Sequence, residues 1–229
     1  MYLVFLALAP VVYLLYEIYK ADRLKEPSGL LIKLFIGGLL SVIPAVFLEL
    51  MVDEPIKSMF NYNPSVMYYI VEAFIGVALI EEGCKYIFLR LFSWNNPNFD
   101  DTFDGIIYAV FVSLGFAALE NILYVMQGGI TVAVSRALLS IPGHMCFSIV
   151  MGFYYSRAKR CAVRQDGSGV TSYTLKGLFG ATFCHGFYDA CAMIGSNFAM
   201  ILFFAFVIAM FYFCRRIVLY ESVNDQHIY

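Results

Sequence analysis

Long apolar stretches, separated by short polar segments, dominate the pattern along this chain. Each is long enough to cross a bilayer as a helix, because a span needs about 20 apolar residues. The pattern therefore predicts an all-α membrane bundle of about seven spans, within a range of six to eight. The predicted spans are residues 2–19, 30–51, 65–92, 105–127, 130–156, 173–194 and 196–214.

Composition supports a lipid environment. The 229 residues are 61% hydrophobic and 14% charged, whereas soluble domains carry about 25% charged residues. The spans leave almost no chain for a soluble domain, so residues 1–229 are interpreted as a single integral-membrane domain. A net charge of −2 gives no sign of a nucleic-acid partner.

The distribution of basic residues predicts the orientation, because positively charged loops stay in the cytoplasm. Basic residues concentrate near alternate span ends, and the opposite ends carry only Lys57 and Arg136. This pattern predicts an outside N-terminus, a cytoplasmic C-terminus and a cytoplasmic loop at 93–104. The cytoplasmic set is Lys20, Arg23, Lys25, Lys33, Arg157, Lys159, Arg160, Arg164, Lys176, Arg215 and Arg216.

Four of the apolar stretches contain ionisable residues, each of which costs about 2.5 kcal/mol or more at the centre of a bilayer. In the third stretch, Lys85 follows Glu81 by four residues and Glu82 by three, so it can reach either carboxylate. A self-neutralising pair is the structural alternative. Such a pair leaves the second carboxylate without a cation. Low dielectric raises the pKa of a surplus carboxylate toward the range that is useful for a general acid or base.

Two other stretches carry Glu120 with Asn121, and His144 directly after Pro142-Gly143, where we expect a kink. In the sixth, His185 and Asp189 are four residues apart, so the carboxylate can hold the imidazole in one tautomer. A protonated structural glutamate and packed histidines are the alternatives. Glutamates and histidines on several neighbouring spans favour a shared functional site.

The known hydrolase motifs GxSxG and HExxH are absent from the sequence. The hydrolytic mechanism that stays open without these motifs is activation of water by a carboxylate, with or without a metal. Zinc could be held by His144 and His185 together with Glu82 or Glu120. Lys85 beside the double glutamate would repel a dication, which favours a site without a tightly bound metal.

Four segments, taken together, resemble the PrsW family of bacterial intramembrane proteases. They occur in the same order and at similar spacing as in that family, and the similarity extends from the first span onward. The segments are EEGCK at 81–85, FDGIIYAVFVSLGFAALENILY at 103–124, RALLSIPGHM at 136–145 and HGFYD at 185–189.

The resemblance implies roles for individual residues. One of Glu81 and Glu82 would activate water. Phe116 and Glu120 match the FxxxH motif of the related CAAX endopeptidases, with glutamate in place of histidine. His185 and Asp189 match HxxxD, and His144 matches the remaining motif.

The resemblance also implies a substrate and a location. PrsW proteins act in the bacterial cell membrane as site-1 proteases on single-span anti-sigma factors, which starts regulated intramembrane proteolysis. We therefore expect a membrane-embedded peptidase with a single-span protein substrate. The alternatives are a non-catalytic scaffold or chaperone, and a proton-coupled transporter. Transporters of that kind usually contain inverted repeats, and this sequence shows none.

Overall fold

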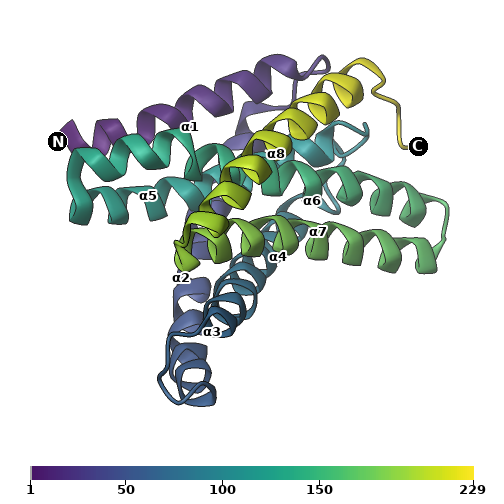
Figure 1. Ribbon diagram of the computed structural model, residues 1–229. Helices are drawn as coiled ribbons and strands as arrows, with labels where there is room; N and C mark the ends of the chain where they lie inside the picture. Colours follow the sequence, from purple (N-terminus) through teal and green to yellow (C-terminus); the bar gives the residue numbers. More distant parts are fainter. Residues whose placement is uncertain (1) are drawn as a thin grey trace.

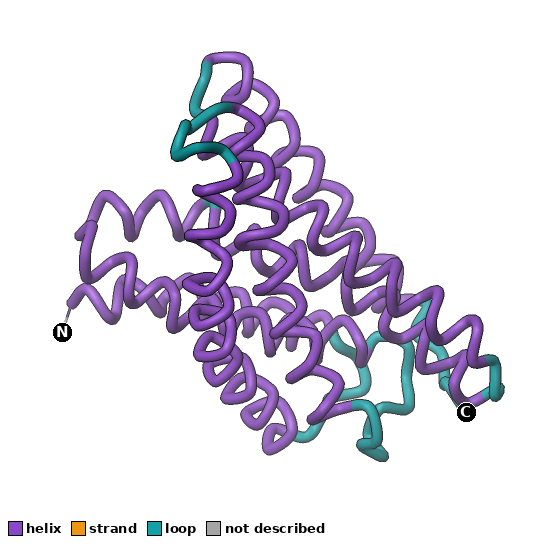
Figure 2. Tube along the Cα trace, turned by 90° about the horizontal axis from the view of Figure 1, so that it is seen from below, coloured by secondary structure: helices purple, strands orange, loops and turns teal. Residues whose placement is uncertain are grey.

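The computed structural model describes residues 2–229 and is all-α, which confirms the expected fold class. Short loops connect the helices (Figure 2). The elements are α1 (Tyr2–Ala21), α2 (Ser28–Met59), α3 (Val66–Val71), a π-helix η1 (Glu72–Ala78), α4 (Leu79–Ser93), α5 (Asp104–Leu138), α6 (Ser140–Val163), α7 (Gly167–Ile194) and α8 (Asn197–Val223).

By length and composition, four helical stretches within residues 2–229 could cross a membrane. They are Tyr2–Ala21, Ser28–Met59, the combined stretch Asp104–Val163, and Asn197–Val223. The predicted spans 65–92 and 173–194 are helical but not among them, and both carry the charged residues that define the candidate site. The count of about seven spans is therefore not confirmed and stays a prediction.

A sharp turn separates the predicted fourth and fifth spans. Gly129 has φ 67° and ψ −153°, which breaks the regular helix within α5. Only glycine adopts this region of backbone conformation without strain. A second break occurs at Leu139, three residues before Pro142. Because proline has no N–H and clashes with the preceding turn, α6 starts anew with Pro142 in its first turn.

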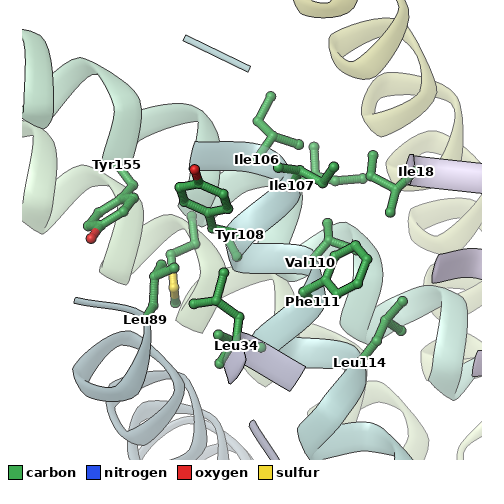
Figure 3. Packing of buried hydrophobic residues seen from close by; sticks show 14 of the residues in the cluster. Ile18, Leu34, Leu89, Ile106, Ile107, Tyr108, Val110, Phe111, Leu114 and Tyr155 are labelled. Carbon is green, nitrogen blue, oxygen red and sulfur yellow. The ribbon is translucent and has the colours of Figure 1, made fainter. Parts of the chain in front are cut away.

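The first half of α5 is the centre of the molecule. Residues 104–118 are all buried, and α5 packs against α1, α2, α4 and α6. Figure 3 shows this packing, with Ile18, Leu34, Leu89 and Tyr155 surrounding the buried side chains of α5. The outer faces of the other helices expose large apolar residues, as expected where lipid replaces water as the solvent.

The helices are not all parallel. Figure 1 shows α2, α3 and α4 forming an arm that projects from the layer of α1, α5, α6 and α7, while α8 crosses that layer diagonally. The arm and the layer meet where α4 packs against α5 and α7. The charged residues of the apolar stretches lie at this junction.

A polar junction joins the α1–α2 loop, the α4–α5 loop and the C-terminal tail. Asp225 accepts hydrogen bonds from the Thr102 hydroxyl (2.9 Å) and from the backbone N–H of Phe103 (2.8 Å). Buried Glu26 accepts a hydrogen bond from the Tyr108 hydroxyl of α5. The junction fixes the end of α8 against the start of α5.

Candidate active site

The double glutamate of α4 is buried and shares one lysine. Lys85 Nζ donates to Glu81 Oε2 at 2.9 Å and to Glu82 Oε1 at 2.8 Å. Glu81 is 5% exposed and Glu82 is 0% exposed. The ammonium also lies 4.2 Å from the centre of the Phe116 ring, which gives the sequence-predicted phenylalanine a contact within the site.

His185 of α7 lies between two carboxylates. Its Nδ1 is 3.0 Å from Glu82 Oε1, and its Nε2 is 3.2 Å from Asp189 Oδ2. The i,i+4 pair expected from the sequence therefore forms, and Glu82 holds the other side of the ring. Both ring nitrogens have a partner, so the orientation of the imidazole is fixed.

His144 of α6 connects the double glutamate with Glu120. Lys85 Nζ lies 3.2 Å from His144 Nδ1, and His144 Nε2 lies 2.9 Å from Glu120 Oε2. The break at Leu139 places His144 in the second turn of the new helix, where its ring also meets that of His185 at a centroid distance of 5.3 Å.

Arg136 completes the network, and its role in the site was missed in the sequence. Its Nη2 donates to Glu120 Oε2 at 2.7 Å, and its Nε donates to Asn121 Oδ1 at 2.7 Å. Asn121 in turn donates to the carbonyl of Ala7 in α1 at 2.8 Å. The distribution of basic residues identifies Arg136 only as a charge near a span end. An arginine inside an apolar stretch was itself the available signal, because a buried cation requires a partner.

The close approach of α7 to η1 helps to position His185. Gly186, the next residue, faces Phe74 of η1, and a Cβ atom at this glycine would lie 2.6 Å from the Phe74 ring. A larger residue here would require the Phe74 ring or α7 itself to move. η1 has π-helical geometry directly before α4, a feature that is frequent at functional sites.

A cavity of about 530 Å³ opens onto this network. Glu81 lines it and Glu82 does not, so only one carboxylate of the pair faces the space. The sequence-predicted residues in its wall are Glu81, Phe116, Glu120, His144, His185 and Asp189. Glu49 of α2, which the sequence pattern does not single out, lies in the wall as well.

The site also offers donors for a metal ion. Glu81, His144 and His185 each present one ligand atom, and these atoms lie within 4.8 Å of one another. Two imidazoles and a carboxylate are a donor set that zinc uses. The sequence suggested Glu82 or Glu120 as the carboxylate ligand, whereas the set in the structure contains Glu81. Glu82 instead bonds to His185, and Glu120 bonds to Arg136. Glu82 Oε2 is buried and has no hydrogen-bond partner among the described residues.

Comparison with protein families gives a match over residues 26–214 to the model described as "PrsW family intramembrane metalloprotease". Several curated proteins are similar over most of their length. Protease PrsW of Geobacillus kaustophilus is 37% identical over 183 residues, which cover 79% of this chain and 75% of that protein.

Two further relatives carry the same description. Protease PrsW of Oceanobacillus iheyensis is 36% identical over 195 residues, covering 85% of each chain. Protease PrsW of Bacillus subtilis is 30% identical over 222 residues, covering 96% of each chain. No solved structure matches this chain.

Proposed function

Because this chain belongs to the PrsW family of intramembrane metalloproteases, we propose that it cleaves a single-span membrane-anchored protein, such as an anti-sigma factor, at the first step of regulated intramembrane proteolysis. The family assignment makes it a multi-pass membrane peptidase with a protein substrate. The scaffold and transporter alternatives gain no support from relatives that are described as proteases.

Glu81 is the proposed general base. This proposal rests on one observation: of the two adjacent glutamates, Glu81 lines the cavity, where water and a peptide can reach it. Glu82 is completely buried and bonds to Lys85 and His185. Its role is to hold these two side chains in place rather than to contact the substrate.

In the proposed reaction, Glu81 takes a proton from water as the water oxygen attacks the peptide carbonyl carbon. His144 and His185 line the same cavity, and their ring nitrogens are already engaged, so they stabilise the oxyanion that forms through the positive charge of a protonated imidazole. The carbon–nitrogen bond then breaks, and Glu81 returns the proton to the leaving amine nitrogen. Asp189 keeps the His185 ring oriented throughout, at its distance of 3.2 Å.

The donor set fits a zinc ion, held by Glu81, His144 and His185. A bound ion would supply Lewis-acid polarisation and would activate water. The Lys85 ammonium is already within 2.9 Å of Glu81 Oε2 and competes with a dication for that carboxylate. We therefore keep the prediction of a site without tightly bound metal, which departs from the metalloprotease description of the family model. Elemental analysis of the purified wild-type protein and of His185→Ala tests this prediction. One equivalent of zinc in the wild type that is lost in the variant would contradict the prediction.

The cleavage test uses the wild-type protein in liposomes together with a single-span anti-sigma factor, with mass spectrometry of the fragments. Glu81→Gln keeps the shape of the side chain but cannot take a proton, so we expect cleavage to fall by about 10²-fold or more. Glu54→Gln changes an exposed carboxylate on α2 and is the matched control. Cleavage at the wild-type rate by purified Glu81→Gln would rule out the proposed base.

A further inference from the structure

Glu49 is a charged residue in the cavity wall that the proposed reaction does not use. It lies on α2, with Val46 one turn and Val42 two turns before it on the same face, and all three line the cavity. Val42 and Val46 show that this face of α2 is otherwise apolar. An ionised carboxylate here is costly unless it takes up a proton or a cation neutralises it.

Within residues 2–229, the Glu49 carboxylate has no such partner. The cations near the site are already engaged, because Lys85 is paired with Glu81 and Glu82 and Arg136 is paired with Glu120. No side-chain hydrogen bond or ion pair in the described part of the chain includes Glu49. Its electrostatic neighbours are two repelling carboxylates, Glu81 and Glu120, and, with smaller effects, the attracting side chains of Lys85 and His185.

The site as a whole has an excess of negative charge. When all five carboxylates are ionised, they outnumber the two permanent cations, Lys85 and Arg136, and a surplus remains even with both site histidines protonated. The five are Glu49, Glu81, Glu82, Glu120 and Asp189. Complementary charge gives specificity at an interface, so the wall formed by α2 favours a cationic group in whatever enters the cavity.

We propose that Glu49 is a specificity-determining residue that binds a lysine or arginine side chain of the substrate close to the scissile bond. The proposal rests on the proposed proteolytic function and adds a substrate feature to it. The aliphatic stem of a basic side chain would pack along Val42 and Val46, and its charged end would reach the carboxylate. A substrate cation thereby neutralises a charge that the protein leaves uncompensated.

A metal ion held by Glu81, His144 and His185 would not replace the substrate cation as the partner of Glu49. Glu49 does not belong to that set of metal donors. Arg136 cannot turn to Glu49 without breaking its bonds to Glu120 and Asn121. The substrate is the remaining source of a matching cation.

The test uses synthetic single-span peptides with an apolar helix and a polar juxtamembrane segment. Lysine, glutamine or glutamate is placed at each position of that segment in turn. The wild-type protein in liposomes is incubated with each peptide, and mass spectrometry locates the cut and gives its rate. We expect the best substrates to carry lysine near the cut, with kcat/KM at least about tenfold above the glutamine peptide.

The variants separate charge recognition from folding. Glu49→Gln should lower kcat/KM for the lysine peptide to that of the glutamine peptide and leave the latter unchanged. Glu49→Lys should reverse the preference toward glutamate peptides. Glu54→Gln, an exposed residue of the same helix, should keep the wild-type profile.

The possible failures are distinguishable. Equal rates for lysine and glutamine peptides in the wild type, or an unchanged lysine preference in Glu49→Gln, overturns the role of Glu49 and leaves the protease assignment intact. A Glu81→Gln protein as active as the wild type on all peptides instead contradicts the proposed catalytic base.

Discussion

At the residue scale, Glu81 and Glu82 have the same chemistry but different surroundings. Glu82 is fully buried and bonds to Lys85 and His185, whereas Glu81 faces the cavity. We expect both glutamine variants to lose cleavage, but only Glu82→Gln to lower the melting temperature clearly. Glu82→Gln takes a carboxylate partner from both Lys85 and His185, and losing one partner of a buried ion pair costs about 3–5 kcal/mol. In Glu81→Gln, the Glu82 carboxylate still holds both side chains.

The measurement is thermal unfolding of both variants in the same detergent, with cleavage assayed in parallel. Equal melting temperatures for Glu81→Gln and Glu82→Gln would argue against a purely structural role for Glu82. A lower melting temperature for Glu81→Gln than for Glu82→Gln would exchange the proposed roles of the two residues.

Arg136 gives a second prediction at this scale. Its guanidinium bonds to Glu120 and Asn121 at the same time, which the single ammonium of a lysine cannot reproduce with the same geometry. Arg136→Ala should lower kcat/KM by about tenfold or more, and Arg136→Lys should restore part of it. The control is Arg157→Ala, because Arg157 pairs with Glu221 away from the cavity. Wild-type kinetics in Arg136→Ala would remove this residue from the site.

At the element scale, the turn at Gly129 returns the chain so that Arg136 meets Glu120. An alanine at Gly129 has space for its Cβ but must adopt φ 67°, which costs about 1–3 kcal/mol. Gly129→Ala should therefore lower both the melting temperature and the cleavage rate. Gly29→Ala also meets no atom within 4 Å but lies in regular helix, where alanine is favoured. Equal melting temperatures for the two variants would show that the turn is not strained.

At the scale of the whole molecule, the polar junction couples stability to pH. Burial raises the pKa of the Glu26 carboxyl from 4.5 to about 7, and the charges of Asp22 and Asp100 add to this, while the hydrogen bond from Tyr108 opposes it. Between these pH values the folded chain holds a proton that the unfolded chain has released. The free energy of unfolding therefore falls as pH rises from about 4.5 to about 7.

Glu26→Gln removes this titration. The melting temperature of the variant relative to wild type should therefore increase from pH 5 to pH 8, as measured by thermal unfolding in detergent. Glu54→Gln, an exposed carboxylate, supplies the baseline. A difference between Glu26→Gln and wild type that stays constant over this range contradicts the coupling.

The sequence by itself determined the all-α class, the membrane environment and the family, because apolar length and the residue types of the four motifs are local properties. It also singled out Glu81, Glu82, Glu120, His144, His185 and Asp189, since ionisable residues in apolar stretches are visible without coordinates. The orientation across the membrane and the number of spans stay predictions.

Only the tertiary structure decided which groups meet. Glu81 and Glu82 are neighbours in the sequence, and packing of α4 against α5 and α7 turns one toward the cavity and buries the other. Arg136 and Glu49 join the site through the turn at Gly129 and the crossing of α2. Such contacts depend on the relative placement of helices far apart along the chain, which helical periodicity within a single segment does not encode.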